Sequence, residues 1–212
     1  MPELSSPETF KRELQPLDPT AVKLWIKTKE MPFLNALSEY GDMLNQGRKG
    51  VGYKFNDIQF EKFVGAGLCT QASRIMRYGI KKQFGENADI WQVASNVDCK
   101  NIDKADTRIK RIPGQPTTTE IGHAWLRFTG TDGQEWFIDP TYGQINHRLN
   151  RIVMSPISKE SSYYNSQEPP TKMFENLPGN NVHEKDWIQL YTDSYTPYQK
   201  AVFFKLLDSL TK

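Results

Sequence analysis

A hairpin signal between Ile121 and Asp139, in the stretch IGHAWLRFTGTDGQEWFID, decides the fold of this chain. Its side chains alternate with a period of two on either side of Asp132-Gly133, a dipeptide typical of tight turns between antiparallel strands. The predicted strands comprise residues 121–128 and 135–138. Because such strands run antiparallel, His123 near the start of the first and Asp139 just after the second come to the same end of the hairpin. Counted outward from the turn, the two side chains are nearly opposite each other.

A helix is predicted upstream of the hairpin, where apolar and small residues recur on one face. These residues are Leu68, Ala72, Ile75, Met76 and Gly79, a spacing typical of one side of a helix. Cys69 falls in the first turn of this helix. A helix N-terminus carries about half a unit of positive charge and exposes unpaired backbone N–H groups, and both favour a thiolate.

Further helices are predicted toward both ends of the chain. Asp18-Pro19 is typical of a helix start, Pro32 interrupts the helix that follows, and the next helical segment stops near Gly47.

The charged stretch 96–120 is expected to lie in solvent, with contact to an acidic partner as the alternative. The other expected segments are a polar arm at 1–17, the second helical segment at 33–44, a turn at 50–53, a short strand at 90–94, a surface stretch at 155–186 and a closing helix at 198–210. The predicted fold class is α+β.

Length and charge place the chain among ordinary globular proteins. It has 212 residues, of which 37% are hydrophobic and 25% charged, with a formal net charge of +2. A single domain spanning residues 1–212 is expected, with its core at about 50–150. The even charge balance argues against a nucleic-acid partner, and no apolar run is long enough for a spanning helix or a standard signal peptide. We therefore expect no membrane association, and a location in the cytoplasm or secretion by a route independent of a signal peptide.

The two cysteines, Cys69 and Cys99, lie in different surroundings, the second in a polar run. A disulfide between them remains open, but so few cysteines without a secretory signal favour reduced thiols. The sequence has no CxxC motif and no cluster of histidine and cysteine at metal-ligand spacing, so neither a metal nor an organic cofactor is expected. The remaining histidines, His147 and His183, lie in polar surroundings and are expected at the surface.

Cys69, His123 and Asp139 are the residue types of a thiol-based catalytic triad. In such a triad a thiolate attacks a carbonyl, an imidazole transfers protons and a carboxylate fixes the imidazole tautomer. The backbone N–H of Cys69 is expected to donate to the developing oxyanion. A second donor is not identified, with Gln59 and Gln71 as candidates. Taken singly, the three triad residues would be a buried filler, a structural histidine and a turn residue; their order and placement together favour catalysis.

The order of these motifs resembles the transglutaminase-like superfamily of papain-fold cysteine enzymes. The motifs are Gly67-Leu68-Cys69, Ala72, Tyr78-Gly79-Ile80, Gly122-His123-Ala124-Trp125 and Trp136-Phe137-Ile138-Asp139-Pro140-Thr141-Tyr142-Gly143, within roughly Gly65 to Gln144. The resemblance implies a nucleophile helix packed on an antiparallel sheet, with Cys69 as nucleophile, His123 as general base and acid, and Asp139 as orienting carboxylate. The sequence departs from papain-like enzymes at Phe63, where they carry glutamine, so the second oxyanion donor stays open.

The resemblance implies acyl transfer through a thioester, most concretely the deamidation or transamidation of a glutamine in a protein or peptide substrate. A cysteine peptidase with the same triad is the nearest alternative, and a non-catalytic interaction domain of the same fold is another. An arylamine acetyltransferase is disfavoured, because its arginine-rich approach to the cysteine is missing. The architecture suggests a secreted bacterial effector. Trp125 and Trp136 are expected in the core, with a place in the wall around the thiol as the alternative.

Overall fold

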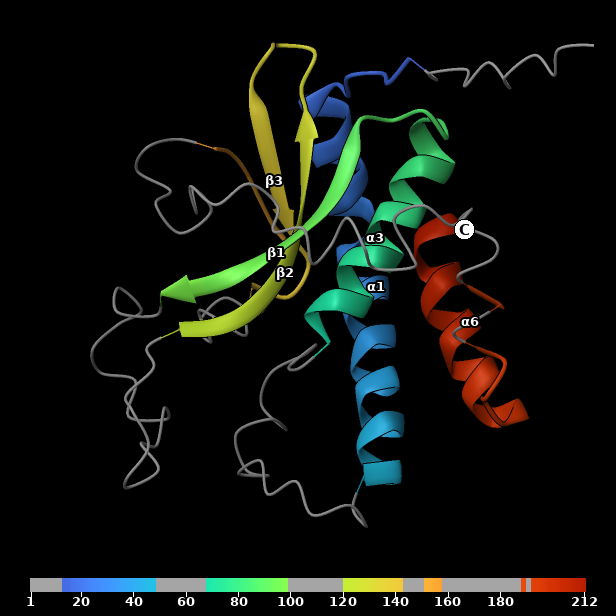
Figure 1. Cartoon of the computed structure of the whole chain (residues 1–212). Coiled ribbons are helices and arrows are strands. Elements are labelled where there is room, and N and C mark those ends of the chain that lie inside the picture. Colours follow the sequence, from blue (N-terminus) through green and yellow to red (C-terminus); the bar gives the residue numbers. More distant parts are fainter. Residues whose placement is uncertain (1–12, 49–67, 99–119, 143–150, 158–187, 190–191) are drawn as a thin grey trace, which may run out of the picture.

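In the part of the chain that it describes, the computed structural model contains three long helices and a four-stranded antiparallel sheet (Figure 1). It describes residues 13–48, 68–98, 120–142, 151–157, 188–189 and 192–212. The helices are α1 (Pro19–Arg48), α3 (Cys69–Phe84) and α6 (Pro197–Thr211). The strands are β1 (Ile90–Asp98), β2 (Glu120–Thr129), β3 (Glu135–Asp139) and β4 (Val153–Pro156), which lie in that order across the sheet. The predicted α+β class is confirmed.

The predicted hairpin is formed by β2 and β3, which pair antiparallel. Its turn is closed by a hydrogen bond from the Gly130 N–H to the carbonyl of Gln134 (2.8 Å). Asp132 Oδ1 accepts from the backbone N–H of Gln134 (3.0 Å). Gly133 has a φ of 74°, a left-handed conformation that glycine adopts without steric cost. The turn signal and the strand alternation therefore agree, and the hairpin prediction is confirmed.

The two edge strands of the sheet differ from the sequence prediction. β1 is expected to end at residue 94 but continues to Asp98, so part of the expected charged loop belongs to a strand. No sequence pattern predicts β4, which pairs antiparallel with β3. Its four residues include Ser155 and Pro156, neither of which favours a strand by itself. The assignment of residues from 155 onward to an irregular surface stretch is therefore wrong for 155–156.

α1 is one continuous helix of 30 residues that contains Pro32, whereas the sequence predicts two helical segments meeting there. A proline inside a helix lacks the N–H of one hydrogen bond and costs about 3 kcal/mol or more. Fully or nearly fully buried side chains lie on both sides of it: Val22, Ile26, Phe33, Leu37 and Tyr40. All belong to the same hydrophobic core, and their burial offsets the local cost. The predicted interruption is wrong.

Capping residues fix the starts of α1 and α6. Asp18 Oδ1 accepts from the backbone N–H of Thr20 (2.9 Å). At α6, Thr196 Oγ1 accepts from the N–H of Gln199 (3.3 Å), and Gln199 Oε1 accepts from the N–H of Thr196 (2.9 Å), which completes a capping box. Both predicted helix starts are confirmed to within a residue. None of the described helices is sufficiently long and apolar to cross a membrane.

α3 lies between the sheet and α6, and α1 packs against α6 behind it (Figure 1). Gly79 permits the close approach of these helices, because a Cβ at this position would come within 2.8 Å of the Leu210 Cβ and 3.1 Å of the Trp25 ring. A larger residue in the middle of α3 would push α6 away from it. The glycine in the sequence motif is therefore explained by helix packing.

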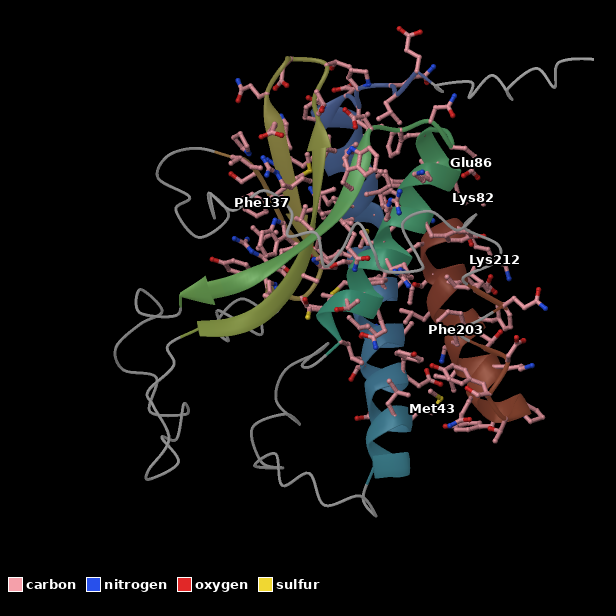
Figure 2. All side chains as sticks on the ribbon, viewed as in Figure 1. Met43, Lys82, Glu86, Phe137, Phe203 and Lys212 are labelled. Atoms are coloured by element: carbon pink, nitrogen blue, oxygen red, sulfur yellow. The ribbon has the colours of Figure 1, made fainter. Side chains whose placement is uncertain are left out.

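The two faces of the sheet contribute to two different hydrophobic clusters, because successive side chains of a strand point to opposite sides. On the face toward the helices, Leu126, Phe128 and Ile138 join the main core. Val93, Trp125 and Phe137 form a second cluster, and Figure 2 shows Phe137 on the side of the sheet away from Phe203 of α6. Trp125 is buried, as predicted, whereas Trp136 is half-buried against the main core.

The end of the predicted polar arm is attached to the sheet. Leu17 is buried, its N–H donates to the carbonyl of Thr129 (2.9 Å), and its carbonyl accepts from the N–H of Thr131 (2.9 Å). Gln15 forms a similar bridge to Ala88. The prediction that a solvated arm extends to residue 17 is therefore wrong for its last residues.

Candidate active site

His123 and Asp139 form a buried hydrogen-bonded pair. The distance between His123 Nε2 and Asp139 Oδ2 is 2.7 Å, and neither side chain is accessible to solvent. Burying a charged group is costly unless it is paired and hydrogen-bonded. The two residues that the sequence places at the same end of the hairpin are thus in direct contact.

The strand register explains this contact. β2 and β3 pair with Leu126 opposite Ile138, so continuing the register sets Asp139 opposite Trp125, two residues from His123. A residue and its diagonal neighbour on one face of an antiparallel pair are within reach of long side chains. The Trp125 ring stacks on the imidazole with centroids 6.0 Å apart and an interplanar angle of 20°. Trp125 therefore belongs to the core and also supports the histidine.

Asp139 has a second set of contacts that fixes its orientation. Its Oδ1 accepts from the backbone N–H of Thr141 (2.8 Å) and from the Thr141 hydroxyl (3.3 Å), while Oδ2 faces the imidazole. This is the local hydrogen bonding expected of an aspartate in a turn. The structural reading of Asp139 and its proposed catalytic role are therefore compatible, because the carboxylate uses a different oxygen for each.

Cys69 is the first residue of α3, and its thiol is free and half-buried. The first hydrogen bond of the helix is donated by the N–H of Ala72 to the carbonyl of Leu68 (2.8 Å). The N–H groups ahead of Ala72 have no acceptor within the helix, and their partial positive charge stabilises a thiolate at this position. The predicted helix start at the cysteine is confirmed.

Hydrogen bonds from buried side chains fasten α3 to β1 and β2. Gln92 Nε2 of β1 donates to the carbonyl of Thr70 (2.7 Å), and Ser73 Oγ donates to the carbonyl of Ala124 (2.9 Å), next to His123. No sequence motif identifies Gln92 or Ser73 as site residues. The available signal was a polar side chain inside an apolar segment, since such residues are rarely buried without a partner. These bonds hold the first turns of α3 beside the strand that carries the histidine.

The thiol and the imidazole shift each other's pKa in opposite directions. Burial raises the pKa of Cys69, but the neighbouring imidazole of His123, with smaller contributions from Ala124 and Thr70, brings it below its usual value. Burial lowers the pKa of His123, but the charge and hydrogen bond of Asp139, followed by the neighbouring thiol of Cys69, raise it to about 10. These shifts favour a thiolate next to an imidazolium.

The two ring nitrogens of His123 have different surroundings. Nε2 is hydrogen-bonded to Asp139. Nδ1 is buried and forms no hydrogen bond of good geometry with a described residue. Nδ1 is therefore the nitrogen left for the thiol of Cys69, which is close enough to shift the imidazole pKa. Hydrogen bonds between catalytic groups are often poorly aligned without substrate and tighten in the complex.

The backbone N–H of Cys69 lies at the helix start, where it has no helical acceptor. Of the two candidates for a second oxyanion donor, Gln71 lies in the first turn of α3 and is half-buried. The amide of Gln92 is directed to the carbonyl of Thr70 instead.

Several sequence predictions fall outside the described residues. These concern Gln59, Phe63, Cys99, His147, His183, the turn at 50–53 and most of the charged stretch 96–120. Among the residues that are described, no group of three potential ligands is arranged to hold a metal ion.

A scan against protein-family models found no match, and searches of curated proteins and of solved structures found no similar chain either. The chemical assignment therefore depends on the residues themselves. A free thiol at a helix N-terminus beside a buried, carboxylate-bound imidazole has the parts needed to attack a carbonyl and to move a proton.

Proposed function

We propose that this chain is a thiol acyl-transfer enzyme with a transglutaminase-like, papain-fold core. Cys69 is the nucleophile, His123 the general acid and base, and Asp139 the carboxylate that orients the imidazole. The substrate is a glutamine side chain of a protein or peptide, which the enzyme deamidates or transamidates. The observation that supports this most directly is the buried His123–Asp139 pair beside a free thiol on a helix start.

In the first half of the reaction, the Cys69 thiolate attacks the carbonyl carbon of the substrate amide. The carbonyl oxygen takes up the negative charge, and the backbone N–H of Cys69 donates to it. The C–N bond then breaks as His123 gives its proton to the departing nitrogen. Ammonia departs, and the acyl group remains bound to the Cys69 sulfur as a thioester.

In the second half, water or a primary amine attacks the thioester while His123 accepts its proton. The C–S bond breaks, the thiolate is restored, and the product is a glutamate or a substituted amide. Asp139 supports both halves because its negative charge stabilises the imidazolium and its fixed Oδ2 holds the tautomer. These steps use only groups of this chain and the substrate, and no cofactor takes part.

Intact-mass spectrometry of a peptide with a single glutamine tests the reaction. Exchange of NH₂ for OH on the peptide indicates deamidation, an adduct with an added primary amine indicates transamidation, and fragments indicate a peptidase. Cys69→Ala should give no product, whereas the matched variant Cys99→Ala should retain the wild-type rate. Product formation by Cys69→Ala would remove this thiol from the mechanism.

Alkylation tests the activated thiol without any substrate. Iodoacetamide should react with Cys69 with an apparent pKa below that of an ordinary cysteine, about 8.5, and His123→Ala should slow the reaction at neutral pH. Cys99 serves as the internal reference within the same molecule. Equally slow labelling of both cysteines would contradict an activated nucleophile and favour a non-catalytic interaction domain.

A further inference from the structure

A groove separate from the thiol lies between α1 and β4, is open to solvent and has a volume of about 520 Å³. Its walls come from one stripe of α1, residues 20–30, and from residues 151–154 at the start of β4. This volume is in the range of known ligand sites, about 300–1,000 Å³. We call it the α1–β4 groove.

Cations dominate the charge of the α1–β4 groove. Lys23, Lys27 and Arg151 line it, and none of them takes part in an ion pair with a described residue. The acidic side chain in the lining is Glu30, whose Oε1 accepts from the backbone N–H of Ile152 (2.8 Å) and thereby joins α1 to β4. Three cations thus face one carboxylate that already has a partner, and the groove is complementary to negative charge.

The same groove has an apolar side. Leu24 projects from α1 with 65% of its surface exposed, between Lys23 and Lys27. Opposite it, Ile152 is buried and Met154 is half-buried. An occupant that satisfies both kinds of lining carries carboxylates and apolar side chains together.

The length of the groove favours a peptide over a compact anion. Its α1 wall spans residues 20–30, which is about 15 Å at 1.5 Å per residue. Extended chain advances about 3.3 Å per residue, so the wall matches four to five residues. Val153 of β4 pairs with Asp139 of β3, so the groove adjoins the strand that ends at the triad carboxylate.

We infer that the α1–β4 groove binds an acidic, partly apolar segment of the protein substrate. This inference rests on the proposed function, because it identifies the occupant as part of the molecule whose glutamine reacts at Cys69. The carboxylates of the segment contact Lys23, Lys27 and Arg151, and its apolar side chains cover Leu24.

Binding is measured first, on the full chain carrying Cys69→Ala, by fluorescence anisotropy of a short labelled peptide of alternating glutamate and leucine. Neutralising the groove with Lys23→Gln, Lys27→Gln and Arg151→Gln should weaken binding about tenfold or more, as expected for several charge contacts. The matched control, Lys29→Gln, Lys200→Gln and Lys212→Gln, removes the same charge outside the groove and should retain binding. Leu24→Glu, at an exposed site, should also weaken binding and leave all three cations in place.

The outcomes separate this inference from the proposed function. Absence of binding, or equal loss in the groove and control variants, would overturn the groove inference whatever the turnover. In otherwise wild-type protein, groove neutralisation should lower kcat/KM for a glutamine peptide with the acidic segment and leave a peptide without that segment unaffected. If both peptides remain unreacted while groove binding is selective, the proposed reaction fails and the binding site stands.

Discussion

Removing the thiol should change how folding stability depends on pH, because Cys69 and His123 contribute with opposite signs. The pKa of His123 is raised from 6.5 to about 10 in the folded chain. Its contribution is therefore fully present below pH 6.5 and is lost as the pH rises through about 10. The pKa of Cys69 is lowered from 9.0, so its contribution is present above pH 9.0 and is lost as the pH falls through the folded value.

Between the two unfolded values, pH 6.5 and pH 9.0, these effects oppose each other in the wild-type chain and offset wherever the pH lies above the folded pKa of Cys69. The folded state holds a proton on the imidazole and none on the thiol, whereas near neutral pH the unfolded state holds it on the thiol. Cys69→Ala removes the cancellation, while Asp139, whose charge is the largest of the influences that raise the His123 pKa, stays in place. From about pH 7 toward the folded pKa of His123, the free energy of unfolding of this variant should fall with rising pH by at most 2.303RT, about 1.4 kcal/mol, per pH unit. Over two pH units such a fall amounts to at most about 3 kcal/mol out of a typical stability of about 5–15 kcal/mol, and the loss of the Cys69 contributions to the His123 pKa makes it smaller.

Urea unfolding followed by tryptophan fluorescence at a series of pH values measures this dependence. The matched control is the double variant Cys69→Ala/Asp139→Asn, in which the charge that raises the His123 pKa is gone. The stability difference between the two variants should shrink steadily from pH 7 to pH 9, and the wild-type chain should show a shallower decline than Cys69→Ala. A difference independent of pH would refute the assignment of a protonated His123 in the folded state.

Three further changes test the site and its supports. Asp139→Asn alone should retain the fold, since its side-chain oxygen still accepts from Thr141, but should lower the initial rate by about 10⁴-fold through loss of imidazole orientation; a rate near wild type would contradict that role. Gln92→Leu removes the bond to the first turn of α3 and should cost about 1 kcal/mol in urea unfolding, with a larger proportional loss in initial rate; an unchanged rate would make Gln92 purely structural. Gly79→Ala should destabilise the chain in thermal unfolding, because overpacking against α6, about 1–3 kcal/mol, exceeds the helix-propensity gain of about 1 kcal/mol. Equal or higher stability would show that α6 moves aside without cost.

The parts of the fold that could be predicted from the sequence are those with local signals. The β2–β3 turn is closed by Gly130, Asp132 and Gln134, all within a few residues of one another, so an Asp-Gly dipeptide and strand alternation suffice to identify it. The start of α3 at Cys69 likewise follows from one stripe of apolar residues. Because the hairpin and the helix start are local, the three candidate catalytic positions can be identified from the sequence.

The parts that could not be predicted depend on contacts between distant segments. The continuation of α1 through Pro32 is supported by core residues that bury against other helices, a gain that no local propensity contains. β4 exists through its pairing with β3, and the Gln92–Thr70 bond links β1 to α3 across many intervening residues. A local pattern of residue types does not show which distant residue each side chain will contact in the fold.

Asp139 forms two sets of hydrogen bonds, which shows that one residue can have a structural and a catalytic role at the same time. An ionised carboxylate accepts at two oxygens, and here Thr141 occupies Oδ1 while His123 occupies Oδ2. The turn bond fixes the rotation of the carboxylate, and that fixed rotation determines where the imidazole is held. A turn aspartate at the end of β3 is thus well suited to orient a histidine on β2, because the same local structure that ends the strand also immobilises the acceptor. The feature that distinguishes the two roles is therefore the partner of the second oxygen, which only the fold can supply.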